Sequence, residues 1–149
     1  MGIVKQQLPQ SNKYTLHWLS ALAIPLANKF YRQYDFRGKA RRNQPCAVVK
    51  NAKGEIIGCG YFRDYGTFKL LAGVAVAPQY QNQGVARLLL NLLAQHFDQN
   101  TYTFPYLPLI PLYQSLGFIT VELNQQLPVY QLYQTYLEQG RQISALVYK

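Results

Sequence analysis

The stretch "VAVAPQYQNQGVARLLLNLLAQHF", residues 74–97, joins an apolar run to a long apolar helix through a polar loop. The run "FKLLAGVAV" is typical of a strand, and Pro78 ends it because proline cannot donate to a sheet ladder. From Gly84 onward, apolar residues recur three or four positions apart, which predicts an amphipathic helix. The first turn of a helix leaves N–H groups unpaired and carries partial positive charge, so it can bind a phosphate. A glycine before a helix also fits a simple turn, so both interpretations stay open on this pattern alone.

Two motifs together favour the phosphate interpretation. The segment "QNQGVA", residues 81–86, fits the pattern [QR]-x-x-G-x-[GA] and follows the strand. It differs from a G-x-x-x-x-G-K-[ST] nucleotide loop because no lysine follows the glycine. It resembles the pyrophosphate loop of the GNAT superfamily of acyl-CoA-dependent N-acetyltransferases. Further along, "LYQSLGF", residues 112–118, resembles the same family's short tyrosine-bearing helix followed by Gly-Phe.

The resemblance implies a mixed α/β fold, the GNAT acyl-CoA N-acyltransferase fold, with a central sheet of six to seven strands flanked by helices on both faces. It implies acetyl-CoA as acyl donor and an amine of a small molecule or peptide as acceptor, joined by direct attack. Backbone groups of Val74 and Val76 would pair with the pantetheine arm. The pyrophosphate site would comprise Gln81, which opens the motif, and the backbone amides of Gln83, Gly84, Val85, Ala86 and Arg87.

Tyr113 resembles the family's general acid, since a phenol in hydrogen-bond range can protonate a departing thiolate. The backbone N–H of Val76 would stabilise the oxygen of the reacting carbonyl. Many relatives carry a glutamate on the strand before the loop as general base, but "FKLLAGVAV" contains no acid. Asp64, Glu122, His17 or a chain of waters are therefore alternative hypotheses for the base.

The rest of the chain is predicted to complete one domain, residues 1–149. Helical spacing predicts a helix over residues 13–34 that Pro25 kinks or divides. Two strands, "CAVVK" and "EIIGCGYF", are joined by a turn at residues 51–54. Beyond the motif helix we expect a short strand at "TYTFPYLP", a helix that Pro111 starts and Gly117 ends, and strands at "FITVEL" and "ISALVYK". The prolines at 105, 108 and 111 could form a polyproline II ligand, but a rigid connection is favoured.

The chain has two cysteines. If Lys50 faces Glu55 across the hairpin, then Cys46 falls directly opposite Cys59. Two reduced, half-buried thiols in a cytoplasmic protein are favoured over a disulfide. Neither cysteine belongs to a cluster with metal-ligand spacing, so no metal is expected.

The formal net charge is +9, and residues 1–50 hold nine Lys and Arg against one acid, Asp35. Such a region attracts phosphates, anionic substrates or nucleic acid, and it favours a neutral or anionic acceptor over a polycation. The densest part contains Arg37, Lys39, Arg41 and Arg42, which could also be a merely solvated loop. This loop, the hairpin and the aromatics around Phe30, Tyr31, Tyr34 and Phe36 could line the acceptor site.

Three function classes are weighed. The leading hypothesis is the N-acetyltransferase, and a catalytically weak acyl-CoA-binding module is the first alternative. A nucleic-acid-binding protein is disfavoured because no aromatic and basic RNA-binding motif is present. No apolar run reaches the roughly 18 residues that span a bilayer, and residues 16–26 are interpreted as part of the folded domain rather than a signal peptide. The tail "LPVYQLYQTYLEQG" would pack on a homodimer partner or on its own sheet.

Overall fold

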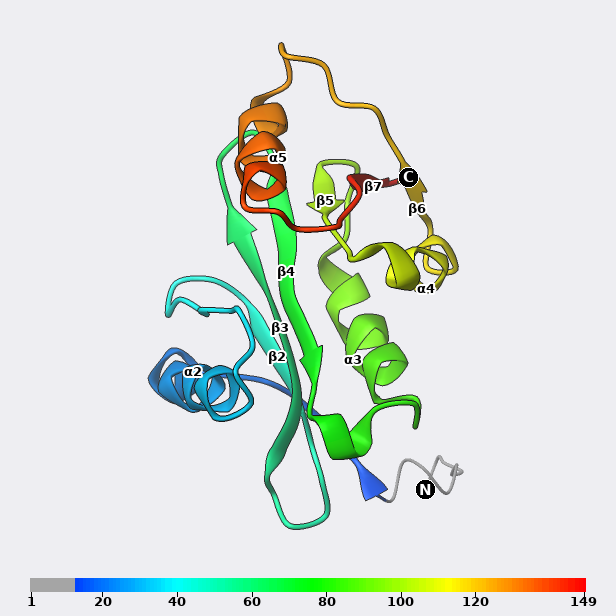
Figure 1. The fold of residues 1–149 in the computed structure, drawn as a ribbon. Helices are drawn as coiled ribbons and strands as arrows, with labels where there is room; N and C mark the ends of the chain where they lie inside the picture. Colours follow the sequence, from blue (N-terminus) through cyan, green and yellow to red (C-terminus); the bar gives the residue numbers. More distant parts are fainter. Residues whose placement is uncertain (1–12) are drawn as a thin grey trace. The chain divides into compact units, whose positions relative to one another are not determined.

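The structure is a computed structural model that describes residues 13–149. Their strands form one mixed sheet of seven in the order β1-β2-β3-β4-β5-β7-β6 (Figure 1). The strands are β1 Thr15–Trp18, β2 Cys46–Lys50, β3 Ile56–Asp64, β4 Lys69–Val76, β5 Thr101–Thr103, β6 Phe118–Thr120 and β7 Leu146–Tyr148. β4 and β5 run parallel, whereas β1–β2, β2–β3, β5–β7 and β6–β7 are antiparallel. The mixed sheet of six to seven strands predicted from the sequence is confirmed.

Helices and short 3-10 turns connect these strands. The helices are α2 Ile24–Gln33, α3 Val85–Leu93, α4 Ile110–Gln114 and α5 Pro128–Glu138, and the 3-10 turns are η1 Ala21–Ala23, η2 Pro78–Tyr80, η3 Ala94–His96 and η4 Leu107–Leu109. The described chain falls into two compact units. The first takes in the chain up to Tyr61 together with Gly73–Leu93, and the second comprises Phe62–Ala72 and Ala94–Lys149.

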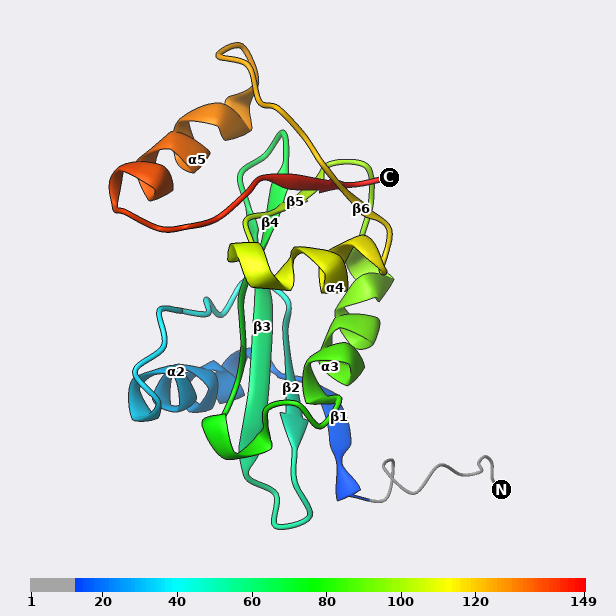
Figure 2. The same ribbon diagram turned by 45° about the vertical axis from the view of Figure 1, so that its right-hand side comes forward.

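In the first unit, α2 and α3 cover opposite faces of the sheet (Figures 1 and 2). A side chain added at Gly60 would meet Leu89 and Leu93 of α3. The next residue, Tyr61, packs its ring edge-to-face on Tyr31 of α2, with centroids 5.9 Å apart. Because successive strand residues point to opposite faces, the two helices lie on opposite sides of β3.

The segment before α2 differs from its predicted structure. Thr15–Trp18 forms β1 and pairs with β2, so the predicted helix over residues 13–34 is wrong at its start. The α-helix begins at Ile24, and Pro25 lies in its first turn instead of kinking its middle. Proline suits that position because the first turn does not need its missing N–H. Pairing with a distant strand decides the structure of β1, which spacing within the segment cannot reveal.

The β2–β3 hairpin has the predicted strands but a different register. Val48, not Cys46, lies opposite Cys59, and a bulge falls between Val49 and Lys50. The turn explains the shift: Asn51 and Gly54 close it with a 2.9 Å bond from Gly54 N to Asn51 O, and Gly54 has φ of +80°. A three-residue hairpin loop with a left-handed glycine forms such a bulge. Because the register differs from the predicted one by two residues, each side chain stays on its predicted face of the sheet. Cys46 and Cys59 therefore still meet diagonally, with free Sγ atoms 3.6 Å apart.

The second unit has an aromatic core. The Phe118 ring lies 5.0 Å from Phe97, 6.0 Å from Tyr113 and 5.5 Å from Tyr148, measured between centroids. The proline-spaced segment forms η4 and the start of α4, which supports a rigid connection and not a polyproline II helix. Gly117 was predicted to follow the helix in the C′ position, but α4 ends at Gln114 with Ser115 as its C-cap, and Gly117 lies two residues beyond that cap with φ of +108°.

The tyrosine-rich tail of the second unit contains α5, which was not predicted. Tyr133 and Tyr136 of this helix pack on Phe104, with centroids 5.0 and 5.6 Å apart. This segment therefore packs on its own chain. A homodimer stays an untested prediction.

Candidate active site

The predicted phosphate loop lies at the start of α3. The first hydrogen bond of this helix runs from Leu88 N to Gly84 O, 3.1 Å, so Gly84 is the residue that caps the helix. The amides of Val85 and Ala86 therefore lie in the first turn, where the helix itself offers no acceptor. Gly84 is exposed, has φ of +83°, and a Cβ placed on it would find no atom within 4 Å. The Cβ side of the residue at the helix start is consequently open.

Side chains of the loop hold its shape. Gln81 Nε2 donates to Val76 O at 3.0 Å, and Gln83 Nε2 donates to Gln79 O at 3.1 Å. The buried Tyr14 donates its hydroxyl to Gln83 Oε1 at 2.8 Å. Both glutamine side chains are therefore engaged in hydrogen bonds within the protein. The predicted contacts to a ligand at Gln83 involve its backbone amide, which this role of the side chain does not obstruct.

The strand that leads into the loop changes conformation at Gly73. β5 pairs with β4 only from Lys69 to Leu71. Two residues later, Gly73 has φ of +65°, and the Tyr31 hydroxyl donates to its carbonyl oxygen at 2.6 Å. Val74 follows directly and is half-buried, so its backbone stands at a part of β4 that β5 does not pair with. This segment can offer main-chain groups to an extended ligand.

Tyr113 lies on α4 in the second unit and is 4% exposed. Burial raises the pKa of this phenol above its usual value, so it carries its proton at neutral pH. Within residues 13–149, its hydroxyl has no hydrogen-bond partner, and its ring packs on Phe118. These properties suit a proton donor.

The candidate bases lie in dissimilar places. His17 lies on β1, is exposed, and has Nε2 2.8 Å from Thr15 Oγ1. Asp64 ends β3 and accepts a 2.8 Å bond from Gly66 N in the following turn. Glu122 is exposed beyond β6. β4 itself carries no carboxylate, as its sequence requires.

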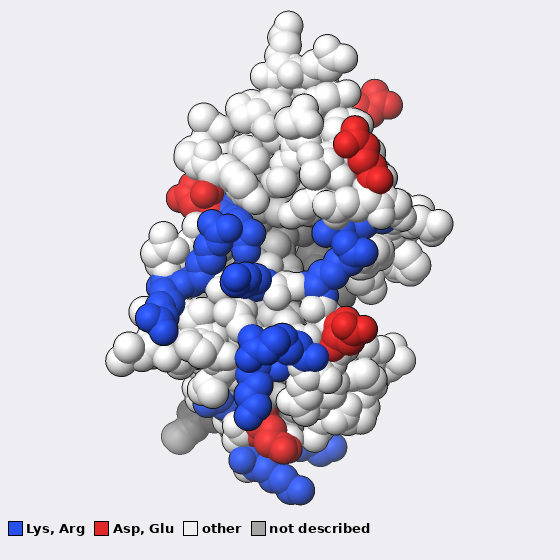
Figure 3. All heavy atoms as spheres, turned by 60° about the vertical axis from the view of Figure 1, so that its left-hand side comes forward, with Lys and Arg blue, Asp and Glu red and all other residues white. Residues whose placement is uncertain are grey.

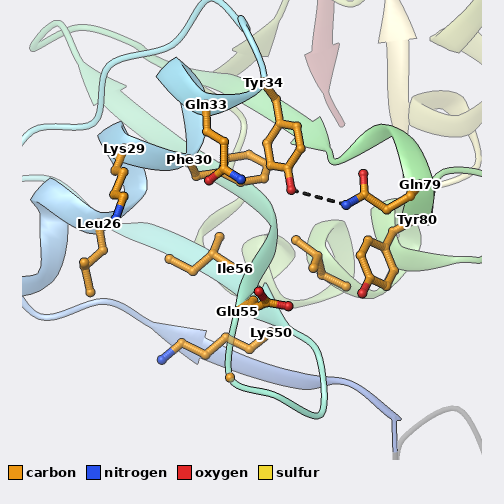
Figure 4. A pocket seen from close by; sticks show the side chains of 12 residues that line it. Leu26, Lys29, Phe30, Gln33, Tyr34, Lys50, Glu55, Ile56, Gln79 and Tyr80 are labelled. Atoms are coloured by element: carbon orange, nitrogen blue, oxygen red, sulfur yellow. Dashed lines mark hydrogen bonds between the residues drawn. The ribbon is translucent and has the colours of Figure 1, made fainter.

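A pocket of about 450 Å³ opens in the first unit between α2, the β2–β3 hairpin and η2 (Figure 4). Its apolar lining includes Phe30 and Ile56, and Lys29 lies beside Leu26 at one side. The hairpin, Phe30 and Tyr34 were expected from the sequence to line the acceptor site, and all three line this pocket. The contribution of η2 was not expected, because no recognisable motif links η2 to these distant segments.

The polar side of that pocket borders the start of the phosphate loop. Gln79 donates through Nε2 to the Tyr34 hydroxyl at 3.3 Å, which joins η2 to α2 (Figure 4). Asn51 Nδ2 donates both to Glu55 Oε1 at 2.9 Å and to the Tyr80 hydroxyl at 3.0 Å. The hairpin, α2 and η2 are thus tied together where the chain enters the loop.

Residues 13–149 contain no group of three or more His, Cys, Asp and Glu placed to hold a metal ion. In the same residues no helix is both long and apolar enough to cross a membrane.

The sequence matches the acetyltransferase (GNAT) domain family over residues 42–120, more than half of the chain. The chain therefore belongs to the GNAT acetyltransferase family, as the two motifs indicated. Comparison with curated protein sequences finds no match.

Solved structures show the same fold at low sequence identity. N-acetylglutamate synthase from Neisseria gonorrhoeae, complexed with coenzyme A and N-acetyl-glutamate, is 18% identical with a TM-score of 0.65, covering 97% of this chain and 35% of the synthase chain. The ribosomal-protein-S18-alanine N-acetyltransferase from Escherichia coli is 17% identical with a TM-score of 0.60, covering 90% of both chains. IAA acetyltransferase from Bacillus cereus is 16% identical with a TM-score of 0.58, covering 91% of this chain and 98% of that one. This chain thus spans about a third of the synthase chain, and the likenesses show a shared fold.

Proposed function

We propose that this protein transfers an acetyl group from acetyl-CoA to the amine of a small molecule or peptide, by direct attack without an acyl-enzyme. The observation that carries the proposal is the helix start at the exposed Gly84, which follows the β4 segment from Gly73 to Val76 through η2 and a short loop. A helix start can bind a phosphate, and an extended strand edge can pair with an amide-bearing chain. The two features together suit a ligand with a pyrophosphate at one end and a flexible amide-bearing arm at the other.

In this proposal the backbone binds the donor. The amides of Gln83, Gly84, Val85, Ala86 and Arg87 hold the pyrophosphate, supported by the partial positive charge of the helix start. Backbone groups of Val74 and Val76 pair with the pantetheine arm. The Val76 carbonyl already accepts one hydrogen bond from Gln81 and retains a second lone pair.

The chemical step needs two proton movements. A C–N bond forms as the amine attacks the thioester carbon, the C–S bond breaks, and the sulfur leaves as a thiolate. Tyr113 donates its proton to that thiolate, and the amine gives up its own proton to a base or a water chain. The backbone N–H of Val76 stabilises the negative charge on the carbonyl oxygen.

We further propose that residues 1–149 act as one acetyltransferase domain, because the family match at residues 42–120 includes parts of both compact units. A cytoplasmic location is part of the same proposal, supported by two cysteines that stay free thiols.

The test combines binding and turnover. Calorimetric titration with acetyl-CoA should show one site per chain, and incubation with acetyl-CoA and a panel of amines should release free coenzyme A, measured with a thiol reagent under native conditions. Tight binding without release on any amine would instead establish the acyl-CoA-binding module, which the absence of a carboxylate on β4 favours. Absence of binding would contradict both.

A further inference from the structure

The basic loop, defined here as residues 36–42, follows α2 in the first unit. It carries Arg37, Lys39, Arg41 and Arg42, all of them exposed. Figure 3 shows Lys and Arg side chains gathered on the face that carries α2 and this segment. Asp35 is the one acidic residue among residues 1–50. The loop therefore produces a concentrated positive field on this face.

Backbone contacts hold the basic loop in one position. Phe36 N donates to Tyr31 O at 2.9 Å. Ala40 forms two hydrogen bonds with the Asn28 side chain, at 2.8 and 3.1 Å, and is 3% exposed. Between them, Gly38 lies flat on the Tyr31 ring, where a Cβ would come within 2.8 Å of ring carbons. A loop fixed at its start, middle and end is pre-organised for binding, unlike a freely solvated one.

These contacts place the basic loop beside Gly73 of β4. Lys39 N donates to the Tyr61 hydroxyl at 3.0 Å, and the Tyr61 ring packs directly on Gly73. Tyr31, under Gly38, donates its hydroxyl to Gly73 O at 2.6 Å. The loop thus reaches β4 at the residue before Val74, through two tyrosine side chains.

The phosphate loop lies at the other end of the same β4 segment. Residues 81–86 come after Val76, whereas the basic loop meets β4 at Gly73. In an extended donor whose pyrophosphate is at Gly84, the arm runs from the loop toward β4, so the thioester carbonyl at the Val76 N–H lies nearer to Gly73 along the chain than the pyrophosphate does. The basic loop therefore stands at the acyl end of that path and not at the pyrophosphate end.

We propose that the basic loop recognises the acceptor, and that the acceptor is a small amine bearing an oxyanion, a carboxylate or a phosphate; this rests on the proposed acetyltransferase function. Arginine presents a planar fork that matches either group with two hydrogen bonds. Arg37, Arg41 and Arg42 lie within six consecutive residues of a fixed loop, which suits one compact oxyanion. The same field repels polycationic amines.

Matched acceptors test the substrate class. Three pairs of amines differ by one anionic group: glycine and glycinamide, aspartate and asparagine, and phosphoethanolamine and ethanolamine. A carboxylate favours the protonated state of its neighbouring amine, so the neutral analogue is intrinsically the better nucleophile at neutral pH. Higher kcat/KM for the anionic member, by about 10-fold or more, supports the proposal. The pair with the largest gain in kcat/KM shows whether the oxyanion is a carboxylate or a phosphate. Equal or higher kcat/KM for the neutral members overturns the proposal.

Variants test the position. Arg41→Ala and Arg42→Ala should each raise the KM for the anionic acceptor by about 10-fold, with the KM for acetyl-CoA unchanged. Lys29→Ala and Lys50→Ala in the neighbouring pocket are matched controls, because they remove a positive charge without touching the loop. An acceptor KM that responds to the pocket variants and not to the loop variants overturns the assignment. Both arginines are exposed, and thermal unfolding checks that the variants fold.

Binding measurements separate this proposal from the function on which it rests. A folded protein that does not bind acetyl-CoA contradicts the acetyltransferase itself, and with it the acceptor proposal. A protein that binds and turns over acetyl-CoA with neutral amines alone contradicts only the acceptor proposal. Salt-sensitive binding of an RNA oligonucleotide that Arg41→Ala and Arg42→Ala abolish, without an anionic acceptor being used, would reassign the loop to nucleic acid.

Discussion

Gly84 allows a charge to be placed at the proposed pyrophosphate site without disrupting the fold. A Cβ at this position meets no atom within 4 Å, so the cost of a side chain is the left-handed backbone, with φ of +83°. That strain is about 1–2 kcal/mol of unfolding free energy. Gly66→Ala provides a control for it, because Gly66 has φ of +88°, also meets no atom within 4 Å, and lies in the β3–β4 turn. Gly84→Gln and Gly84→Glu should therefore fold, with stability losses near that of Gly66→Ala.

The two Gly84 variants differ by one negative charge, whose effect can be estimated. For a carboxylate about 5 Å from a phosphate charge, the repulsion is about 0.8 kcal/mol in water and about 3 kcal/mol at an effective dielectric constant near 20. Gly84 is exposed, which favours the lower value for each charge. Two phosphate charges then give about 1.6 kcal/mol, so Gly84→Glu should bind coenzyme A at least about 10-fold more weakly than Gly84→Gln.

Titration calorimetry with coenzyme A measures this difference, with unfolding monitored by circular dichroism. The gap between the Glu and Gln variants should be largest at low salt and narrow near 1 M salt, where the screening length falls to about 3 Å. Wild-type protein and Gly66→Ala should bind equally well. If folded Gly84→Glu and Gly84→Gln bind coenzyme A with equal affinity at low salt, the pyrophosphate does not lie at this helix start.

Three further predictions follow from buried groups. Tyr113→Phe should lower kcat by about 10²- to 10⁴-fold with coenzyme A affinity unchanged. Because burial raises the pKa of Tyr113, wild-type kcat should show no loss from phenol ionisation below about pH 10. Full activity of the variant would exclude this proton donor. Gly73→Ala, with φ of +65° and a Cβ that clashes with Tyr61, should lose about 2–5 kcal/mol of unfolding free energy in a denaturant titration. A loss equal to that of Gly66→Ala would show that the clash relaxes. Cys46 and Cys59 are 0% exposed, so a thiol reagent should reach neither side chain until denaturant is added. Rapid labelling of the native protein would contradict this packing.

The elements that local sequence predicts well are those with strong internal patterns. The helix from Gly84 was predicted because its apolar spacing and its glycine cap lie in one continuous segment, and α3 begins at Val85. The strand ending at Val76 follows the same logic, since Pro78 acts on its immediate neighbours.

Elements that depend on distant partners were not predicted correctly. Thr15–Trp18 becomes a strand because it pairs with β2, although its segment has helical spacing. The hairpin register, by contrast, depends on local contacts that charge pairing across the strands does not reveal, because Asn51 Oδ1 accepts bonds from Lys53 N and Glu55 N and so sets the turn. α5 gains stability from Phe104, a residue well before it in the chain.

By itself, the sequence determined the family and the fold class, and it predicted the phosphate loop, because the loop motif is continuous and its proposed function depends on backbone shape. Only the tertiary structure decided where the basic loop lies. Gly38, Tyr61 and Gly73 come from three separate segments, and packing of two tyrosine rings brings them together. Such proximity depends on which faces of α2, β3 and β4 meet, a property that no local pattern encodes.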